Sequence, residues 1–290
     1  MMRRVGLMTC EQLPHLHQDD RLLIEPLAGL GVEAVPVVWS APGWAAAAAG
    51  CSALVLRSTW DYVHRLGEFV RWLDAVQEAG ARLVNPAAVV RWNLDKRYLL
   101  ELEGRGVPII PTALVQQGTR VDLAAMLRER GWSEALVKPT VSVNALGTWR
   151  VGGGDAGAAQ ERLDAALERS GALVQQFQHA VLSEGELSFV FFDRRFSHAL
   201  RKQPRPGDFR VQEDHGGRTV REPSPAPALL AQAEAVLEVI DGDLTYARVD
   251  GVVKDGRFLL MEVELAEPSL YLACHPPAAV TFADAIARRL

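Results

Sequence analysis

The sequence contains few cysteines, and no two of them are close together. They are Cys10, Cys51 and Cys274, and no Cys-x-x-Cys pair occurs. An odd and widely spaced set argues against a disulfide framework and against a cysteine zinc site. We therefore expect a protein of a reducing compartment, the cytoplasm.

A long hydrophobic run is also missing. The longest apolar stretch, around residues 41–49, is rich in alanine, contains Pro42 and Gly43, and is too short to span a bilayer. The first residues hold two arginines and only a short apolar run, which is typical of a first strand and not of a signal peptide. We expect neither a membrane segment nor a membrane partner.

Positive charge is not in excess. The chain has 31 Lys and Arg against 36 Asp and Glu, a net charge of -5. Nucleic-acid binding depends largely on clustered basic side chains, so this balance argues against a nucleic-acid partner, although it allows a local basic pocket. The length of 290 residues is enough for two or three folded units.

Strands and helices alternate in the first third of the sequence. Such alternation predicts a parallel sheet covered on both faces, here a Rossmann-like α/β domain over residues 1–92. The expected strands lie at 4–9, 32–38, 53–57 and 82–84, and the expected helices at 20–30 and 67–79.

Residues 93–290 predict a second, mixed α/β (α+β) part. We expect a helix at 93–103, a small unit at about 112–178, and a strand-rich remainder. In the small unit and its approach, strands are expected at 107–112, 135–138, 148–151 and 172–177, with helices at 121–130 and 155–169. In the remainder, strands are expected at 186–192, 196–202, 209–213, 246–253 and 258–265, with helices at 226–240 and 278–290.

Three carboxylates are expected to converge near the end of the chain. Glu262 and Glu264 alternate with apolar residues on one strand, so they share a face. A turn connects this strand to the preceding one, and antiparallel pairing would place Asp250 beside them. Converging carboxylates repel one another unless a cation lies between them, and hard oxygen ligands suit Mg²⁺. A solvated polar face of a two-stranded ribbon would explain the same spacing.

Four cationic side chains could face such a site. Lys138 ends an apolar strand and precedes a small polar loop at residues 140–148, whose backbone N–H groups could approach a phosphate chain. Lys96 is expected at the start of a helix, while Lys202 and Arg210 flank a turn-rich segment. Taken singly, each of them could be an ordinary surface residue.

A series of short motifs follows a distinctive order along the chain. They are Asn85-Pro86, Asn93-Leu94-Asp95-Lys96, Gly106-Val107-Pro108, Val137-Lys138-Pro139, Val174-Gln175-Gln176-Phe177, Gly185-Glu186, Gly207-Asp208-Phe209-Arg210, Asp250 and Glu262-Val263-Glu264. This order resembles the ATP-grasp superfamily, in particular the bacterial glutathione-synthetase-like carboxylate–amine ligases, from about residue 85 to the C-terminus. Residues 58–62, 196–199 and 267–270 are most similar to the cyclising ligases that form D-cycloserine, which would place the chain in antibiotic biosynthesis.

The resemblance implies an ATP-grasp fold over residues 93–290, with a pre-ATP-grasp domain at 1–92 and a lid at about 112–178. It implies ATP and two Mg²⁺ ions, with Mn²⁺ as an alternative, and small-molecule carboxylate and amine substrates; a homo-oligomer is allowed. The implied roles are phosphate contacts for Lys96 and Lys138, the adenine hinge for Gln175, Gln176 and Phe177, ribose binding for Glu186, metal ligands for Asp250, Glu262 and Glu264, and catalytic contacts for Arg210 and Lys202.

Two features depart from the family pattern. Relatives often carry several glycines in the lid loop, whereas only Gly147 lies between Lys138 and Arg150. The third metal position, often Asn, is Glu264, which adds negative charge. These departures bear on the rate of turnover and on the affinity for the metal, and they leave the predicted fold unchanged.

Substrate contacts are expected after the third strand of the parallel sheet. Arg57, Asp61 and Tyr62 follow that strand, and ligands bind at the carboxyl ends of strands in such sheets. An ordinary capped loop would explain them equally well. Residues 152–157 match G-x-G-x-x-G, but the next strand gives Gln175-Gln176 and no acidic residue, so we interpret them as a turn with Asp155 as helix N-cap.

The sequence thus predicts a ligase that activates a carboxylate as an acyl phosphate for attack by an amine-type nucleophile, which can belong to the same molecule. We expect ATP between the lid and the C-terminal half, and substrate between residues 57–62 and Arg210. Two alternatives stay open: an ATP-binding regulatory protein without turnover, and a phosphotransferase acting on a hydroxyl.

Overall fold

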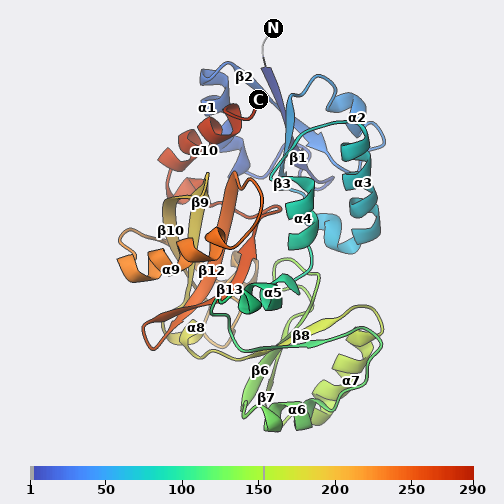
Figure 1. Ribbon diagram of the computed structural model, residues 1–290, viewed down its shortest axis with the longest axis vertical. Helices are drawn as coiled ribbons and strands as arrows, with labels where there is room; N and C mark the ends of the chain where they lie inside the picture. Colours follow the sequence, from blue (N-terminus) through green and yellow to red (C-terminus); the bar gives the residue numbers. More distant parts are fainter. Residues whose placement is uncertain (1–2, 153) are drawn as a thin grey trace.

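A parallel sheet forms one end of the molecule in the computed structural model, which describes residues 3–152 and 154–290 (Figure 1). Its strand order is β2-β1-β3-β4. The strands are β1 (Arg3–Thr9), β2 (Val32–Val38), β3 (Ala53–Ser58) and β4 (Leu83–Val84). The helices between them are the 3-10 helix η1 (Asp20–Leu23), α1 (Ile24–Gly29), α2 (Trp44–Ala47), η2 (Trp60–His64) and α3 (Leu66–Glu78). The predicted Rossmann-like domain is confirmed.

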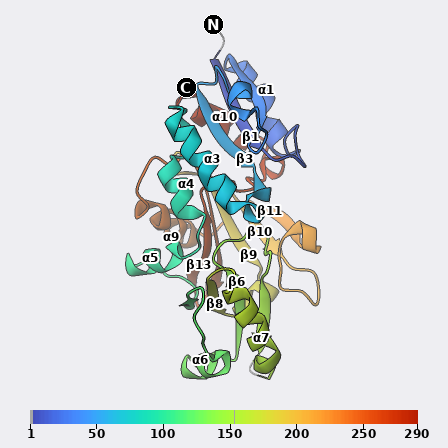
Figure 2. The same cartoon turned by 90° about the vertical axis from the view of Figure 1, so that its right-hand side faces the viewer.

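A small antiparallel sheet with two helices lies at the opposite end of the molecule (Figure 2). Its strand order is β5-β8-β6-β7, and its core is separate from the others. The elements are β5 (Thr112–Val115), α6 (Leu123–Glu129), β6 (Glu134–Pro139), β7 (Trp149–Gly152), α7 (Ala156–Leu167) and β8 (Ala172–Gln176). Asp155 is the N-cap residue of α7, as expected, while Gly153 of the same turn lies outside the described residues.

The five-stranded antiparallel sheet between these ends has the order β11-β10-β9-β12-β13. Its strands are β9 (Glu186–Phe192), β10 (Arg195–Gln203), β11 (Arg218–Glu222), β12 (Tyr246–Lys254) and β13 (Arg257–Glu264). The accompanying helices are α4 (Ala87–Asn93), α5 (Tyr98–Gly104), α8 (Ala180–Ser183), η3 (Glu213–His215), α9 (Pro227–Glu238), η4 (Leu272–Cys274) and α10 (Pro277–Ala287). The α/β class is therefore confirmed.

Three predicted elements differ from the structure. The strand predicted at 107–112 pairs with a sheet only through a single bridge between Ile109 and Leu260, and β5 begins at Thr112. In place of the helix predicted at 93–103 there are two helices: α4 ends at Asn93 and α5 begins at Tyr98. Lys96 therefore lies in the turn between them and not at a helix start. The strand predicted at 209–213 is a loop, because the Asp208 carboxylate accepts hydrogen bonds from the backbone N–H groups of Phe209 and Arg210. The edge strand is β11 instead, which the sequence hid because it is polar and has no apolar alternation.

The last helix, α10, packs back against the first domain. Its Phe282 ring stacks on Phe192 of β9 at 4.8 Å between centroids, and one hydrophobic cluster joins α10 to β1, β3 and α1. The parallel sheet and the central sheet thus share a core, which fixes the position of one relative to the other. Among the described residues no helix has the length and apolarity that a membrane crossing requires.

A buried arginine strengthens this junction. The Arg57 side chain is fully buried at the end of β3, and its Nε donates to Asp20 Oδ1 at 2.9 Å. Its Nη2 donates to the carbonyl oxygen of Pro268 at 2.7 Å, in the loop that follows β13. The guanidinium thereby links three segments that are far apart in the sequence.

We predict that Arg57→Met lowers the free energy of unfolding by about 3–5 kcal/mol, because it leaves the Asp20 carboxylate buried without its cation. Arg4→Met is the matched control: Arg4 is about a third exposed and pairs with the exposed Glu33 at the surface, where a pair contributes about 0–1 kcal/mol. Urea unfolding followed by circular dichroism gives both values. Equal losses for the two variants would contradict the proposed role of Arg57.

Candidate functional site

The site is a cavity of about 1160 Å³ to which all three units of the fold contribute. Its wall includes η2 of the first domain, the turn before α5, β6 and β8 of the small sheet, and the inner face of β12 and β13. Most ionisable side chains that the sequence singled out line it: Lys96, Lys138, Glu186, Lys202, Arg210, Asp250, Glu262 and Glu264. The cavity has the concave, mixed polar and apolar character of a small-molecule site.

The carboxylates lie on paired strands, as expected. Asp250 of β12 is directly opposite Glu262 of β13, and a register shift follows at Gly251. Gly251 cannot be replaced without movement, since a Cβ atom there would lie 2.5 Å from the backbone oxygen of Leu259. This close approach fixes the register that brings Asp250 to Glu262.

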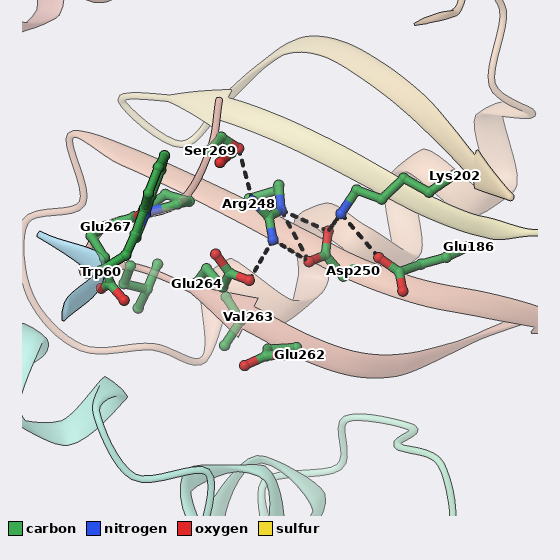
Figure 3. A network of polar contacts seen from close by, with 12 residues as sticks. Trp60, Glu186, Lys202, Arg248, Asp250, Glu262, Val263, Glu264, Glu267 and Ser269 are labelled. Carbon is green, nitrogen blue, oxygen red and sulfur yellow. Dashed lines mark hydrogen bonds and ion pairs between the residues drawn. The ribbon is translucent and has the colours of Figure 1, made fainter. Parts of the chain in front are cut away.

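Arg248 lies among these carboxylates and was not predicted. Its guanidinium donates to both oxygens of Asp250 at 2.9–3.0 Å and also pairs with Glu264, as Figure 3 shows. Arg248 and Asp250 are two residues apart on β12 and so share a face. That spacing was the signal in the sequence: an arginine two positions before a metal-ligand candidate.

Lys202 continues the network from β10. Its Nζ lies 3.1 Å from Glu186 Oε1 and 3.6 Å from Asp250 Oδ1 (Figure 3). Burial and the nearby Arg248 lower the pKa of Lys202, but Asp250 and Glu186 more than offset both, so its pKa is raised. Lys202 is therefore a fixed positive charge in the centre of the cavity.

A second group of charges forms around Glu262. Lys96 Nζ lies 3.0 Å from Glu262 Oε1 and also donates to the carbonyl oxygen of Ser142 in the polar loop. Burial lowers the pKa of Lys138, Glu262 opposes this and Lys96 adds to it, and the resulting pKa is about 8. An incoming anion would raise the pKa of Lys138 again.

The donor set fits Mg²⁺ in its chemistry. Asp250, Glu262 and Glu264 offer hard carboxylate oxygens, and Mg²⁺ commonly takes one or two carboxylates together with phosphate oxygens and water. Each of the three forms an ion pair with a protein cation, Glu262 with Lys96 and the other two with Arg248. Accordingly, no three His, Cys, Asp or Glu side chains of residues 3–152 and 154–290 gather into a metal cluster.

Arg210 lines the cavity but stands apart from this network. It forms a bidentate pair with Asp208. This hydrogen bonding holds the pKa of the Asp208 carboxyl well below its usual range. The side chain is about a third exposed. The cations in direct contact with the metal-ligand candidates are Lys96, Lys202 and Arg248, and not Arg210.

The predicted adenine hinge closes the far end of the cavity. Gln175, Gln176 and Phe177 at the end of β8 all line it. Gln175 Nε2 donates to Thr112 Oγ1 at 2.9 Å, and the Arg150 guanidinium lies over the Phe177 ring at 4.0 Å. Apolar Leu136 and Met261 add to the wall. This end suits a flat aromatic ligand with polar edges.

Of the three predicted substrate residues, the structure places one in the cavity wall and two outside it. Arg57 is a structural link, fully buried and outside the cavity wall, so the expectation that it contacts substrate is wrong for this arrangement. Asp61 is also outside the wall and accepts hydrogen bonds from Trp39 Nε1 and Arg65. Tyr62 does line the cavity. Beside it lies Glu267, a cavity carboxylate that the sequence analysis did not single out as a site residue.

Comparison with known proteins places this site in a family. Residues 5–85 match the family model described as the N-terminal domain of D-cycloserine synthetase DcsG. The cycloserine biosynthesis protein DcsG of Streptomyces lavendulae is 35% identical over 252 residues, covering 82% of this chain and 83% of that protein. The crystal structure of D-cycloserine synthetase DcsG superposes with a TM-score of 0.87 at 30% identity, covering 99% of both chains.

More distant solved structures share the fold of this chain. The structure of D-alanine–D-alanine ligase from Bacillus anthracis complexed with ATP has a TM-score of 0.70 at 17% identity, covering 99% of this chain and 97% of that one. At that identity the likeness concerns the fold alone. The DcsG matches show that the chain belongs to the DcsG family, and its fold is that of ATP-grasp ligases such as PsnB, which superposes with a TM-score of 0.67 at 16% identity over 100% of both chains.

Proposed function

We propose that this protein activates the carboxylate of a small amino acid with ATP and closes a ring through a nucleophilic nitrogen of the same molecule, as D-cycloserine formation requires. The observation that carries the proposal is one cavity in which Lys96, Lys138, Lys202 and Arg248 face the carboxylates Asp250, Glu262 and Glu264. Such a reaction belongs to antibiotic biosynthesis, and the three free cysteines are consistent with the cytoplasm.

ATP would extend from the hinge to the charged centre. In this proposal Gln175, Gln176 and Phe177 bind the adenine, and Glu186 binds the ribose. Lys96 and Lys138 bind the phosphates. For Lys96, a phosphate would replace its present partners, the Glu262 carboxylate and the Ser142 carbonyl oxygen. Asp250, Glu262 and Glu264 would hold two Mg²⁺ ions, with Mn²⁺ as an alternative. Bound there, the metal would neutralise phosphate charge and favour phosphoryl transfer.

The chain's own residues would then position charge. A substrate carboxylate oxygen attacks the γ-phosphorus and ADP leaves; the nitrogen then attacks the acyl carbon, and phosphate leaves with the transferred oxygen. Both steps develop negative charge on oxygen, which fixed cations stabilise. Lys202 and Arg248 are held by buried hydrogen bonds and need no reorganisation, and Arg210 adds a third cation at the cavity wall.

Residues about 112–178 would act as a lid. They have their own core, and the loop at 140–148 touches the opposite wall through two polar contacts. Asn144 Nδ2 donates to Asp214 Oδ2, and the Asn144 carbonyl oxygen lies 3.2 Å from His215 Nε2. Breaking these two exposed contacts, together with the hydrogen bonds from Lys96 to the carbonyl oxygens of Thr140 and Ser142, would open the cavity to ATP.

An oxygen-18 experiment tests the ligase mechanism. The probe is β-aminooxy-D-alanine, the amino acid that results from hydrolysis of the D-cycloserine ring amide, labelled in its carboxylate. We expect one label in the released phosphate, detected by mass spectrometry, without any added amine. Product formation with no label in phosphate would contradict the proposal. A phosphotransferase acting on a hydroxyl would keep the phosphate on its product, and a panel of other amino acids extends the test to further substrates.

Nucleotide binding should also change the protonation of Lys138. With its pKa near 8, Lys138 is largely neutral at pH 8.5, and bound phosphates should raise that pKa and draw in a proton. Calorimetry of Mg·AMPPNP binding in buffers of different ionisation enthalpy measures the uptake. Lys138→Arg is the control, since arginine stays protonated and any proton released elsewhere is common to both proteins. At pH 8.5 the wild type should take up more protons on binding than Lys138→Arg, and at pH 6.5 the two proteins should take up equal numbers. Equal proton uptake at pH 8.5 would refute the role of Lys138.

A further inference from the structure

One carboxylate of the cavity differs from the others. Glu186, Asp250, Glu262 and Glu264 each lie within 4 Å of a lysine or arginine nitrogen. Glu267 has no such ion pair with any residue in 3–152 or 154–290. Its residue exposure is only 8%, and burial raises the pKa of its carboxyl to about 7. A buried carboxylate without a cation is unfavourable unless a ligand supplies one.

The backbone around Glu267 is fixed in an unusual way. Three successive carbonyl oxygens each accept a hydrogen bond from a different part of the protein. Trp60 Nε1 donates to the Glu267 carbonyl at 2.9 Å, Arg57 Nη2 to that of Pro268 at 2.7 Å, and Arg248 Nη1 to that of Ser269 at 2.8 Å. The carboxylate is therefore presented to the cavity by a rigid loop, as a preorganised binding group is.

The neighbours of Glu267 leave its charge available. The Tyr62 hydroxyl is its hydrogen-bonding partner, which favours the ionised form. Lys96 is near enough to influence it, but that cation is already bound to Glu262 and to the Ser142 carbonyl. Figure 3 shows Glu267 and Trp60 at one end of the row of charged side chains and Glu186 at the other. Glu267 thus lies at the end remote from the proposed ribose contact.

We infer that Glu267 binds the ammonium group of the substrate and so restricts the enzyme to amino-bearing carboxylates. The inference rests on the proposed function, in which the substrate carboxylate is activated beside Arg248. Glu267 belongs to the same three-residue loop whose Ser269 carbonyl accepts from Arg248, and both side chains line the cavity, so we expect one small zwitterion to contact both. A carboxylate lacking the amino group would leave Glu267 buried without a cation and is therefore disfavoured.

Calorimetry with two probes tests this assignment. One probe is β-aminooxy-D-alanine, and the other is 3-aminooxypropionate, which lacks the α-amino group; both are titrated into the full-length protein with Mg·AMPPNP. The wild type should prefer the amino compound by about 30-fold or more, the usual effect of a buried charge pair. Glu267→Gln should abolish most of this preference by weakening the amino compound only. Glu213→Gln, which removes an exposed carboxylate of the same cavity, should keep it.

Other outcomes separate the two proposals. An unchanged preference in Glu267→Gln, equal binding of both probes by the wild type, or binding of neither would overturn the assignment. A preference that depends on Glu267, together with no release of ADP when ATP replaces AMPPNP and β-aminooxy-D-alanine is present, would leave the assignment standing and refute the ligase proposal. If Glu267→Gln does not fold, as judged by its melting curve, Glu267→Asp replaces it; the shorter carboxylate should weaken the amino compound and leave 3-aminooxypropionate unchanged, and equal effects on both would overturn the assignment.

Discussion

The contact of Arg248 with Asp250 and Glu264 is the interaction on which the rest of the site depends. Two adjacent strands bring several carboxylates into one partly buried cavity, and like charges at such distances repel strongly where water is scarce. Arg248 removes that repulsion from within the same strand face. It also donates to the Ser269 carbonyl, so a single guanidinium pairs with two of the three metal-ligand candidates and fixes the loop that carries Glu267.

The cations of the cavity come from different parts of the fold. Lys96 lies in the turn between α4 and α5, Lys138 on β6 of the small sheet, and Lys202 on β10 of the central sheet. A polyanionic ligand that binds all three therefore joins separate units of the fold. This arrangement explains how a nucleotide could favour closure of the lid: the attraction between its phosphates and Lys138 adds to the two exposed contacts made by Asn144.

Sequence reasoning was most successful where one local pattern determines the outcome. Alternation of strand and helix predicted the parallel sheet, and the period of two along β13 predicted that Glu262 and Glu264 share a face and that Asp250 lies opposite. It failed where long-range contacts decide. Arg57 has the position of a ligand contact but is buried by Asp20 and Pro268, which are distant in sequence. The isolation of Glu267 from cations is likewise a property of the folded cavity and leaves no trace in local spacing.

The central claim is that the carboxylates of β12 and β13, now neutralised by protein cations, form the magnesium-dependent nucleotide site. The most direct test is calorimetric titration of AMPPNP into wild type and Glu262→Gln, each with and without Mg²⁺. For the wild type, magnesium should tighten binding by at least about tenfold, a ratio equivalent to 1.4 kcal/mol. Glu262→Gln should bind AMPPNP without magnesium, because Lys96 is released from its ion pair, and should gain little when magnesium is added. An equal magnesium effect in the two proteins would contradict the account.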